Sequence, residues 1–304
     1  MTLQIHRLSF KAMGSACEVV LAAQTQQVAE QMAKLAIDEV LRIERKYSRY
    51  TSDSVIAQIN RGAGHEKVHC DDETWSLFQF AAQLHDKSEG LFDITSGVLR
   101  QAWDFKKPAL PSAQKLEELL PLIGWHQVAM EDHSIALPKL GMEVDFGGFG
   151  KEYAADRAAQ LLTEKGVAHG YVNLAGDMRF MGPKPSGEPW LIGIQDPRQH
   201  DEVVATLPMS QGGLATSGDY ERYFEMNGQR YCHVLNPRTG WPVKYWRTVS
   251  VTAPLAVLAG CTATIAMLKE VQGPEFLKST GFDYLAIDQS GNVHIRNDSR
   301  ADLN

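Results

Sequence analysis

The chain has 304 residues, of which 44% are hydrophobic and 22% are charged, so it has the composition of a folded globular protein. The formal net charge of -7 argues against a nucleic-acid-binding surface, which requires clustered Lys and Arg. We therefore expect no nucleic-acid partner, and an anionic ligand would have to be held by local groups or by a metal ion.

The cysteines and the hydrophobic pattern narrow the class of protein further. Cys17, Cys70, Cys232 and Cys261 lie far apart without zinc-site spacing, so we expect reduced, semi-buried thiols. No stretch approaches 18 apolar residues, which predicts no transmembrane segment. The first 14 residues contain no apolar signal region. We expect a cytoplasmic protein as given, or a periplasmic one if an export signal has been removed.

The first half of the chain is predicted to hold more helices than strands. Apolar residues at spacings of three and four predict a helix over 26–47, after a strand over 16–23. A short segment that ends at Ile59-Asn60 follows this helix. Asp71-Asp72 should cap a second helix that ends at Gly90. A surface loop over 103–111 and a short helix over 112–120, capped by Ser112, follow.

The second half is predicted to be mostly strands. The expected elements, in order, are a hairpin around Val128 and Ile135; a strand ending at Phe146; a helix that begins near Tyr153; strands over 169–174, 190–195 and 203–207; a tight turn at 216–218; a hairpin turning at Asn227-Gly228; a strand over 249–252; a helix over 254–270; and a last hairpin turning at 289–292. Strands outnumber helices and many are joined by hairpins, so the fold class is α+β, with mixed, mainly antiparallel sheets flanked by helices.

The stretch from Val144 to Asp156 indicates a glycine turn that leads into a helix. A helix entered through glycines presents free main-chain N–H groups to an anion such as phosphate, and Asp145 and Lys151 flank this turn. Alternatively, its glycines only permit tight packing. It is neither a P-loop nor a dinucleotide fingerprint, because Glu152 stands where a P-loop has Ser or Thr, and Tyr153 stands at the third fingerprint glycine.

Three other positions could carry chemistry. His233 precedes the turn Asn236-Pro237-Arg238-Thr239-Gly240, which makes it the best placed histidine for proton transfer, although a packed histidine would fit equally well. Asp177 follows a strand and a glycine, and could be a loop acid or a turn residue. Ser217 lacks the surroundings of a hydrolase nucleophile.

Seven blocks, taken in order, resemble the ApbE family of FAD:protein FMN transferases over residues 10 to 290. The blocks are Met13-Gly14-Ser15, 47–60 (Tyr47-Ser48-Arg49-Tyr50 to Ile59-Asn60), Gly90-Leu91-Phe92-Asp93, 145–156, Asn173-Leu174-Ala175-Gly176-Asp177, Thr216-Ser217-Gly218-Asp219-Tyr220, and 233–240. The resemblance implies one ApbE-like domain over 1–304, with an FAD cleft between two subdomains.

The resemblance also implies a reaction. In this family a Ser or Thr hydroxyl of an acceptor protein attacks the FMN-side phosphorus of FAD, AMP leaves, and Mg²⁺ assists. His233 matches the candidate base, and 216–220 would wall the cleft. The positions that match FAD-lining residues are Met13, Tyr50, Leu91, Phe92, Asp93, Asp145, Lys151 and Leu235. The alternatives are an FAD pyrophosphatase and an FAD-binding protein without chemistry.

The chain departs from the family pattern around the metal. The resemblance implies metal ligands at the Gly148 carbonyl and at Thr264, but the family's aspartate position is Gly260. Two neutral oxygens make a weak Mg²⁺ site. The usual Lys-Gly is Lys151-Glu152, and Asn236 replaces an aspartate. Glu152 could partly replace the missing ligand, or it could point to solvent and stabilise the helix N-terminus through its dipole; we favour the second interpretation.

Overall fold

A computed structural model describes residues 2–199 and 201–298, and its centre is an eight-stranded antiparallel sheet. The strand order is β1-β2-β6-β7-β10-β13-β14-β15. Its strands are β1 (Gln4–Ala12), β2 (Ser15–Ala23), β6 (Gly170–Leu174), β7 (Asp177–Gly182), β10 (Gly212–Gly218), β13 (Trp246–Ala253), β14 (Asp283–Asp288) and β15 (Val293–Arg296). The expected α+β class with mainly antiparallel sheets is confirmed.

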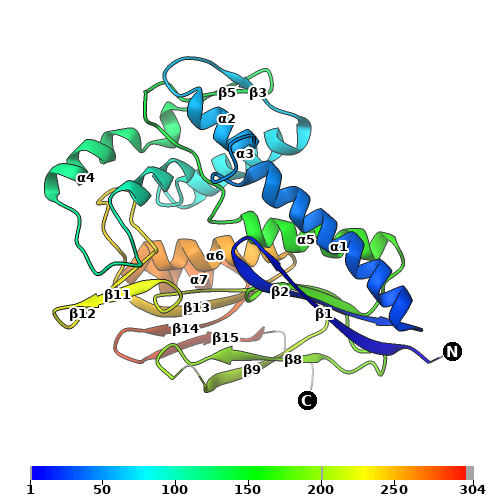
Figure 1. The fold of residues 1–304 in the computed structure, drawn as a ribbon. Coiled ribbons are helices and arrows are strands. Elements are labelled where there is room, and N and C mark those ends of the chain that lie inside the picture. Colours follow the sequence, from blue (N-terminus) through cyan, green and yellow to red (C-terminus); the bar gives the residue numbers. More distant parts are fainter. Residues whose placement is uncertain (1, 200, 299–304) are drawn as a thin grey trace.

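Helices cover one face of this sheet and a hairpin covers the other (Figure 1). The covering helices are α1 (Gln26–Tyr47), α5 (Gly150–Glu164), α6 (Ala256–Lys269) and α7 (Gly273–Thr280). The hairpin strands β8 (Trp190–Gln195) and β9 (Val203–Met209) pack Trp190 and Ile194 against Tyr171 and Leu214 of the sheet. The main core therefore lies between the sheet and the helices.

The remaining elements form the side of the molecule that carries α3 and α4 in Figure 1, together with a small hairpin. They are α2 (Val55–Arg61), β3 (Val68–His69), α3 (Asp72–Lys87), η1 (Ile94–Gln101), α4 (Ala113–Leu119), η2 (Leu120–Leu122), η3 (Trp125–Gln127), β4 (Ala129–Glu131), β5 (Ser134–Ala136), β11 (Tyr223–Met226) and β12 (Gln229–Cys232). A short 3-10 helix, η4 (Glu270–Gln272), connects α6 to α7. No helix among the described residues is long and apolar enough to cross a membrane.

Several local predictions are confirmed. The helix over 26–47 has the predicted bounds, and it buries Ala29, Ala36 and Val40 on one face. Asp71 and Ser112 cap their helices, because their side chains accept hydrogen bonds from Thr74 and Lys115. All four cysteines are free and buried.

Two local predictions are wrong. The expected turn at 216–218 belongs to β10, whose small residues admit a close helix: a Cβ on Gly213 would lie 2.2 Å from the Ala256 nitrogen. The expected strand ending at Phe146 is an irregular segment, since Asn60 from α2 satisfies both the N–H and the C=O of Val144 in place of a neighbouring strand. Strands β1 and β7 were not predicted.

Asp156 joins α5 to the start of α6. The N-cap residue of α6, Leu255, supplies no capping side chain. Instead, the Asp156 carboxylate accepts hydrogen bonds from the N–H groups of Ala256 and Val257, each at 2.9 Å. Arg179 lies 3.5 Å from the same carboxylate. This buried cap from a neighbouring helix fixes how α5 and α6 lie against each other.

We expect Asp156→Ala to lower the free energy of unfolding by about 2–3 kcal/mol, because it leaves two buried N–H donors without an acceptor. Urea denaturation measures the change. Asp38→Ala is the control, since Asp38 is an exposed helix residue that pairs with the exposed Lys34, and it should cost under about 0.5 kcal/mol. Equal stabilities of the two variants would contradict the role of Asp156.

Candidate functional site

The glycine turn before α5 is built for close approach to other groups. Phe149 stands at the N-cap and contributes no side-chain hydrogen bond, so the first N–H groups of α5 lack a side-chain cap. A Cβ on Gly148 would lie 2.9 Å from Cζ of Phe92, so this glycine packs directly on that ring. The structure therefore brings together two of the predicted site residues, Gly148 and Phe92, beside an uncapped helix N-terminus.

Lys151 and Asp177 form an ion pair beside this turn. Lys151 Nζ lies 3.0 Å from Asp177 Oδ2. Asp177 starts β7 after the turn residues Ala175 and Gly176, which have φ of +58° and +96°. Burial opposes the charge of Lys151, but Asp177 and Glu152 outweigh it and raise the pKa of Lys151. The lysine is therefore positively charged, and it stands at the N-terminal end of α5, where it can bind an anion.

His233 lies in the loop after β12, as the sequence predicts. The main-chain N–H of His233 donates to the Arg222 carbonyl at 3.0 Å. The ring Nδ1 of His233 is buried without a hydrogen-bond partner among the described residues. Burial, together with the charges of Arg222 and Lys151, lowers the pKa of His233 to about 3. The imidazole is therefore neutral near pH 7, and the same burial makes it a weak base.

Thr264 of α6 lies beside β10. Its hydroxyl is 3.0 Å from the hydroxyl of Ser217. Ser217 had no predicted role beyond the wall of the cleft, because nothing in the sequence indicates that a strand residue would meet a helix residue 47 positions later. The pair offers two neutral oxygens at one place.

Glu152 lies against α6 and does not point to solvent. It is 8% exposed, and a Cβ on Gly260 would lie 2.3 Å from its Oε1. Burial, reinforced by Asp177, raises the pKa of Glu152 well above its usual range. The expectation that Glu152 points to solvent is therefore wrong, because residue 152 faces α6 rather than water.

Asp145 is held by an arginine that the sequence analysis missed. Arg49 Nη1 lies 2.5 Å from Asp145 Oδ2, and the Arg49 guanidinium lies 5.0 Å from the ring centroid of Tyr50. The other oxygen of Asp145 accepts the N–H of Gly147 at 3.0 Å. Tyr50 is 81% exposed. Arg49 thus contacts two predicted FAD-lining residues, Asp145 and Tyr50, and places a positive charge beside the glycine turn.

Other predicted positions are more enclosed. Leu91, Phe92 and Asp93 are buried. Asp93 accepts from the Thr95 N–H at 2.8 Å and from the Trp125 N–H at 2.9 Å, so both of its oxygens already have partners. Leu235 packs against the small clusters around Leu99 and Trp103. Among the described residues, no hydrogen bond links Leu235 to the glycine turn.

Met13 lies at the turn between β1 and β2. Its φ is +52°, and its N–H donates to Glu44 Oε1 at 2.7 Å. A cavity of about 480 Å³ lies against this turn. The lining residues are Lys11, Ala12, Gly14, Ser15, Ala16 and Glu44. Cys17 of β2 pairs with Leu174 of β6, and Leu174 pairs with Asp177 of β7. The turn between β1 and β2 therefore lies near the ion pair of Asp177 with Lys151.

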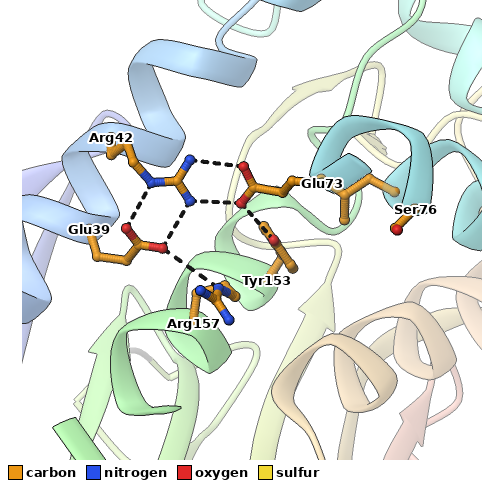
Figure 2. Close-up of a pocket in the computed structure, with 7 residues that line it drawn as sticks. Glu39, Arg42, Glu73, Ser76, Tyr153 and Arg157 are labelled. Carbon is orange, nitrogen blue, oxygen red and sulfur yellow. Dashed lines mark hydrogen bonds and ion pairs between the residues drawn. The ribbon is translucent and has the colours of Figure 1, made fainter. Parts of the chain in front are cut away.

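A larger hollow of about 540 Å³ lies elsewhere, between α1, α3 and α5 (Figure 2). There Arg42 donates to Glu39 and Glu73, and the Tyr153 hydroxyl donates to Glu73 at 2.8 Å. Burial alone would raise the pKa of Glu73, but these donors hold it far below its usual range. The charges in this hollow already satisfy one another, which is typical of a structural network.

No group of three or more His, Cys, Asp or Glu among residues 2–199 and 201–298 forms a ready metal cage. The donors that the site offers are oxygens: the Thr264 hydroxyl beside Ser217, the main chain at Gly148, and the buried Glu152 carboxylate. Mg²⁺ accepts hard oxygen ligands and commonly completes its shell with substrate phosphates and water. These residues fit such an ion.

Comparison with known protein families and with named proteins gives a consistent result. A family model described as the ApbE family matches residues 13–286. Proteins named FAD:protein FMN transferase from Vibrio cholerae (29% identity, 82% of this chain and 76% of the relative) and Treponema pallidum (30% identity, 80% and 76%) are similar to it.

Solved structures have the same fold. The ApbE protein of Thermotoga maritima superposes with a TM-score of 0.90 at 30% identity, over 98% of both chains. The apo flavinyl transferase ApbE of Pseudomonas stutzeri gives 0.86 at 24% identity, over 98% of this chain and 96% of that one, and at this identity it supports the fold alone. The family match covers most of the chain: the protein belongs to the ApbE family.

Proposed function

We propose that this protein transfers the FMN half of FAD to a Ser or Thr hydroxyl of an acceptor protein and releases AMP. The observation that carries the proposal is the family match over residues 13–286, with relatives named FAD:protein FMN transferase. The site adds a chemical reason, since a cation and an uncapped helix N-terminus meet at the glycine turn. Both groups suit a pyrophosphate.

Lys151 would bind the pyrophosphate of FAD. Its pKa is raised, so it stays charged over the working pH range. Asp177 holds the ammonium at 3.0 Å and limits where it can point. Free N–H groups of α5 would add hydrogen bonds to phosphate oxygens. Together these groups would hold the phosphorus atom in place for in-line attack.

His233 would take the proton of the acceptor hydroxyl. The acceptor oxygen forms a bond to the FMN-side phosphorus, the bond from that phosphorus to the bridging oxygen breaks, and AMP leaves with the electron pair. The proton goes to the imidazole, which is neutral near pH 7. Because its low pKa makes it a weak base, the negative charge of the bound pyrophosphate would have to stabilise the imidazolium that forms. Hydrolysis would differ only in the use of water as the nucleophile, which is why a pyrophosphatase is the alternative enzyme.

The remaining predicted positions would line the FAD. Phe92 lies under Gly148 and would support the turn, while exposed Tyr50 offers a ring for stacking. Asp145, held by Arg49, could accept a hydrogen bond from the adenine or ribose. Met13 and Leu91 would add apolar surface. Asp93 would act by holding the chain near Trp125, since its oxygens have main-chain partners, and Leu235 would lie at the border of the site.

We propose Mg²⁺ as the metal of this site. The Gly148 carbonyl and the Thr264 hydroxyl would hold it, together with oxygens of the substrate. When bound, such an ion neutralises pyrophosphate charge as the leaving group departs. Ser217 would orient the Thr264 hydroxyl through their 3.0 Å contact. An FAD-binding protein without chemistry remains the alternative from another class, because Gly260 carries no carboxylate.

Incubation with FAD, Mg²⁺ and an acceptor protein should yield a covalently fluorescent acceptor and AMP. A denaturing gel and AMP chromatography measure the two products. His233→Asn should slow transfer by about 10²–10⁴-fold while FAD binding is kept, because only the proton acceptor is lost. Free FMN plus AMP would instead show a pyrophosphatase, and unchanged FAD would show a binding protein.

The protonation of His233 should also appear in the pH dependence of stability. Its folded pKa of about 3 lies below the ordinary 6.5, so the folded state binds fewer protons between these values, and stability is lost as the pH falls below about 6.5. Between pH 7 and 5 the wild type should lose up to about 2 kcal/mol more than His233→Asn. Urea unfolding at both pH values measures this, and equal losses would contradict a buried neutral imidazole.

A further inference from the structure

We propose that Glu152 supplies the carboxylate ligand of the metal site from α5, in place of a carboxylate at position 260 of α6. This inference rests on the proposed function, because it completes the metal site named there. It assigns a role to a residue whose identity departs from the family pattern at the start of α5.

The first support is that Glu152 occupies the space of a side chain at position 260. A Cβ on Gly260 would lie 2.3 Å from Oε1, 2.7 Å from Cγ and 2.8 Å from Cδ of Glu152. These separations are far below van der Waals contact, so any side chain at position 260 would displace this carboxylate. Glycine at 260 and glutamate at 152 therefore make a matched pair: one helix gives up its side chain and the other fills the same volume.

The second support is the register of the two helices. Asp156 bonds the N–H groups of Ala256 and Val257. One turn earlier on α5 and one turn later on α6, Glu152 meets Gly260. Thr264 stands one further turn along α6 from Gly260, and Gly148 stands in the glycine turn just before α5. The Glu152 carboxylate thus lies between the two helices at the end where both other proposed ligands occur in the sequence.

The third support is that this carboxylate has no counter-charge of its own. Glu152 is 8% exposed, and its side chain makes no hydrogen bond or ion pair with another residue in the part of the chain that the structure describes. The neighbouring cation, Lys151, is already paired with Asp177 at 3.0 Å. A buried carboxylate without a partner is costly, so it either takes up a proton or pairs with a cation, and a bound metal ion would supply that cation.

The chemistry of the resulting donor set suits a hard divalent cation. A carboxylate, a hydroxyl and a main-chain carbonyl are oxygen ligands of the kind that Mg²⁺ and Mn²⁺ accept. Glu152 restores the one negative charge that glycine at 260 removes. The metal site would thus keep its charge while drawing its carboxylate from the opposite helix.

The test is calorimetric titration of Mn²⁺ and Mg²⁺ into the whole protein, with thermal unfolding as a second readout. Glu152→Gln keeps the shape of the side chain and removes its charge. We expect it to weaken Mn²⁺ binding by about tenfold or more. Without metal it should be at least as thermally stable as the wild type, and Mg²⁺ should raise the unfolding temperature of the wild type only.

Two further variants test the exchange between the helices. Gly260→Asp alone should not tighten Mn²⁺ binding and should lower thermal stability, because the new side chain collides with Glu152. Glu152→Ala combined with Gly260→Asp should bind Mn²⁺ within about threefold of the wild type, since the carboxylate then comes from α6. Glu39→Gln, which removes a partly buried carboxylate from the network in Figure 2, is the control and should leave Mn²⁺ affinity unchanged.

Three results would overturn the assignment. They are Mn²⁺ binding by Glu152→Gln as tight as by the wild type, tighter binding by Gly260→Asp alone, and no metal binding by the wild type. None of them decides whether FMN is transferred, because the flavin-transfer assay on the wild-type protein measures that separately. Failure of the metal assignment and failure of the proposed function are therefore distinguishable.

Discussion

The site depends on the contact between α5 and α6. Asp156 caps α6 from α5, and the facing positions are small, with Ala155 and Ala159 buried on α5 and Ala259 and Gly260 buried on α6. Small residues let two helices approach closely. That approach sets Glu152 against Gly260, while the turn before α5 and the ion pair of Lys151 with Asp177 follow from where α5 begins. A shift of α5 along α6 would move every one of these groups.

Helix α5 contacts two groups of charged side chains, and they differ in whether each buried charge is balanced by an opposite charge. On the side shown in Figure 2, Arg42 and Tyr153 satisfy Glu73, so nothing further is required for stability. On the side that faces α6 and β7, Glu152 lies buried near Asp177 with Lys151 as the shared cation. Unbalanced buried charge is characteristic of sites that await a ligand. The hollow in Figure 2 thus has the features of a structural network, and we propose that the chemistry belongs to the region around Glu152, Lys151 and Asp177.

Sequence reasoning succeeded where a signal is local and failed where packing decides. The 3.6-residue period located the helix over 26–47, and side-chain caps located the starts at Asp71 and Ser112. The order of short motifs indicated the family. Neighbours on a helix point about 100° apart, so we expected Glu152 to face water once Lys151 faced the ligand. Helix α6 buries the direction that Glu152 takes, and no periodicity in α5 shows this. Arg49 was missed for the same reason, since its partner Asp145 lies 96 positions away.

The most direct test of the central claim is anomalous diffraction from crystals of the whole protein grown with Mn²⁺ and FAD. We predict a manganese peak between α5 and α6, within coordination distance of the Glu152 carboxylate and the Thr264 hydroxyl, with a phosphate oxygen of FAD in the same shell. A manganese peak that contacts Thr264 while Glu152 remains turned away, or a peak elsewhere on the protein, would contradict the account.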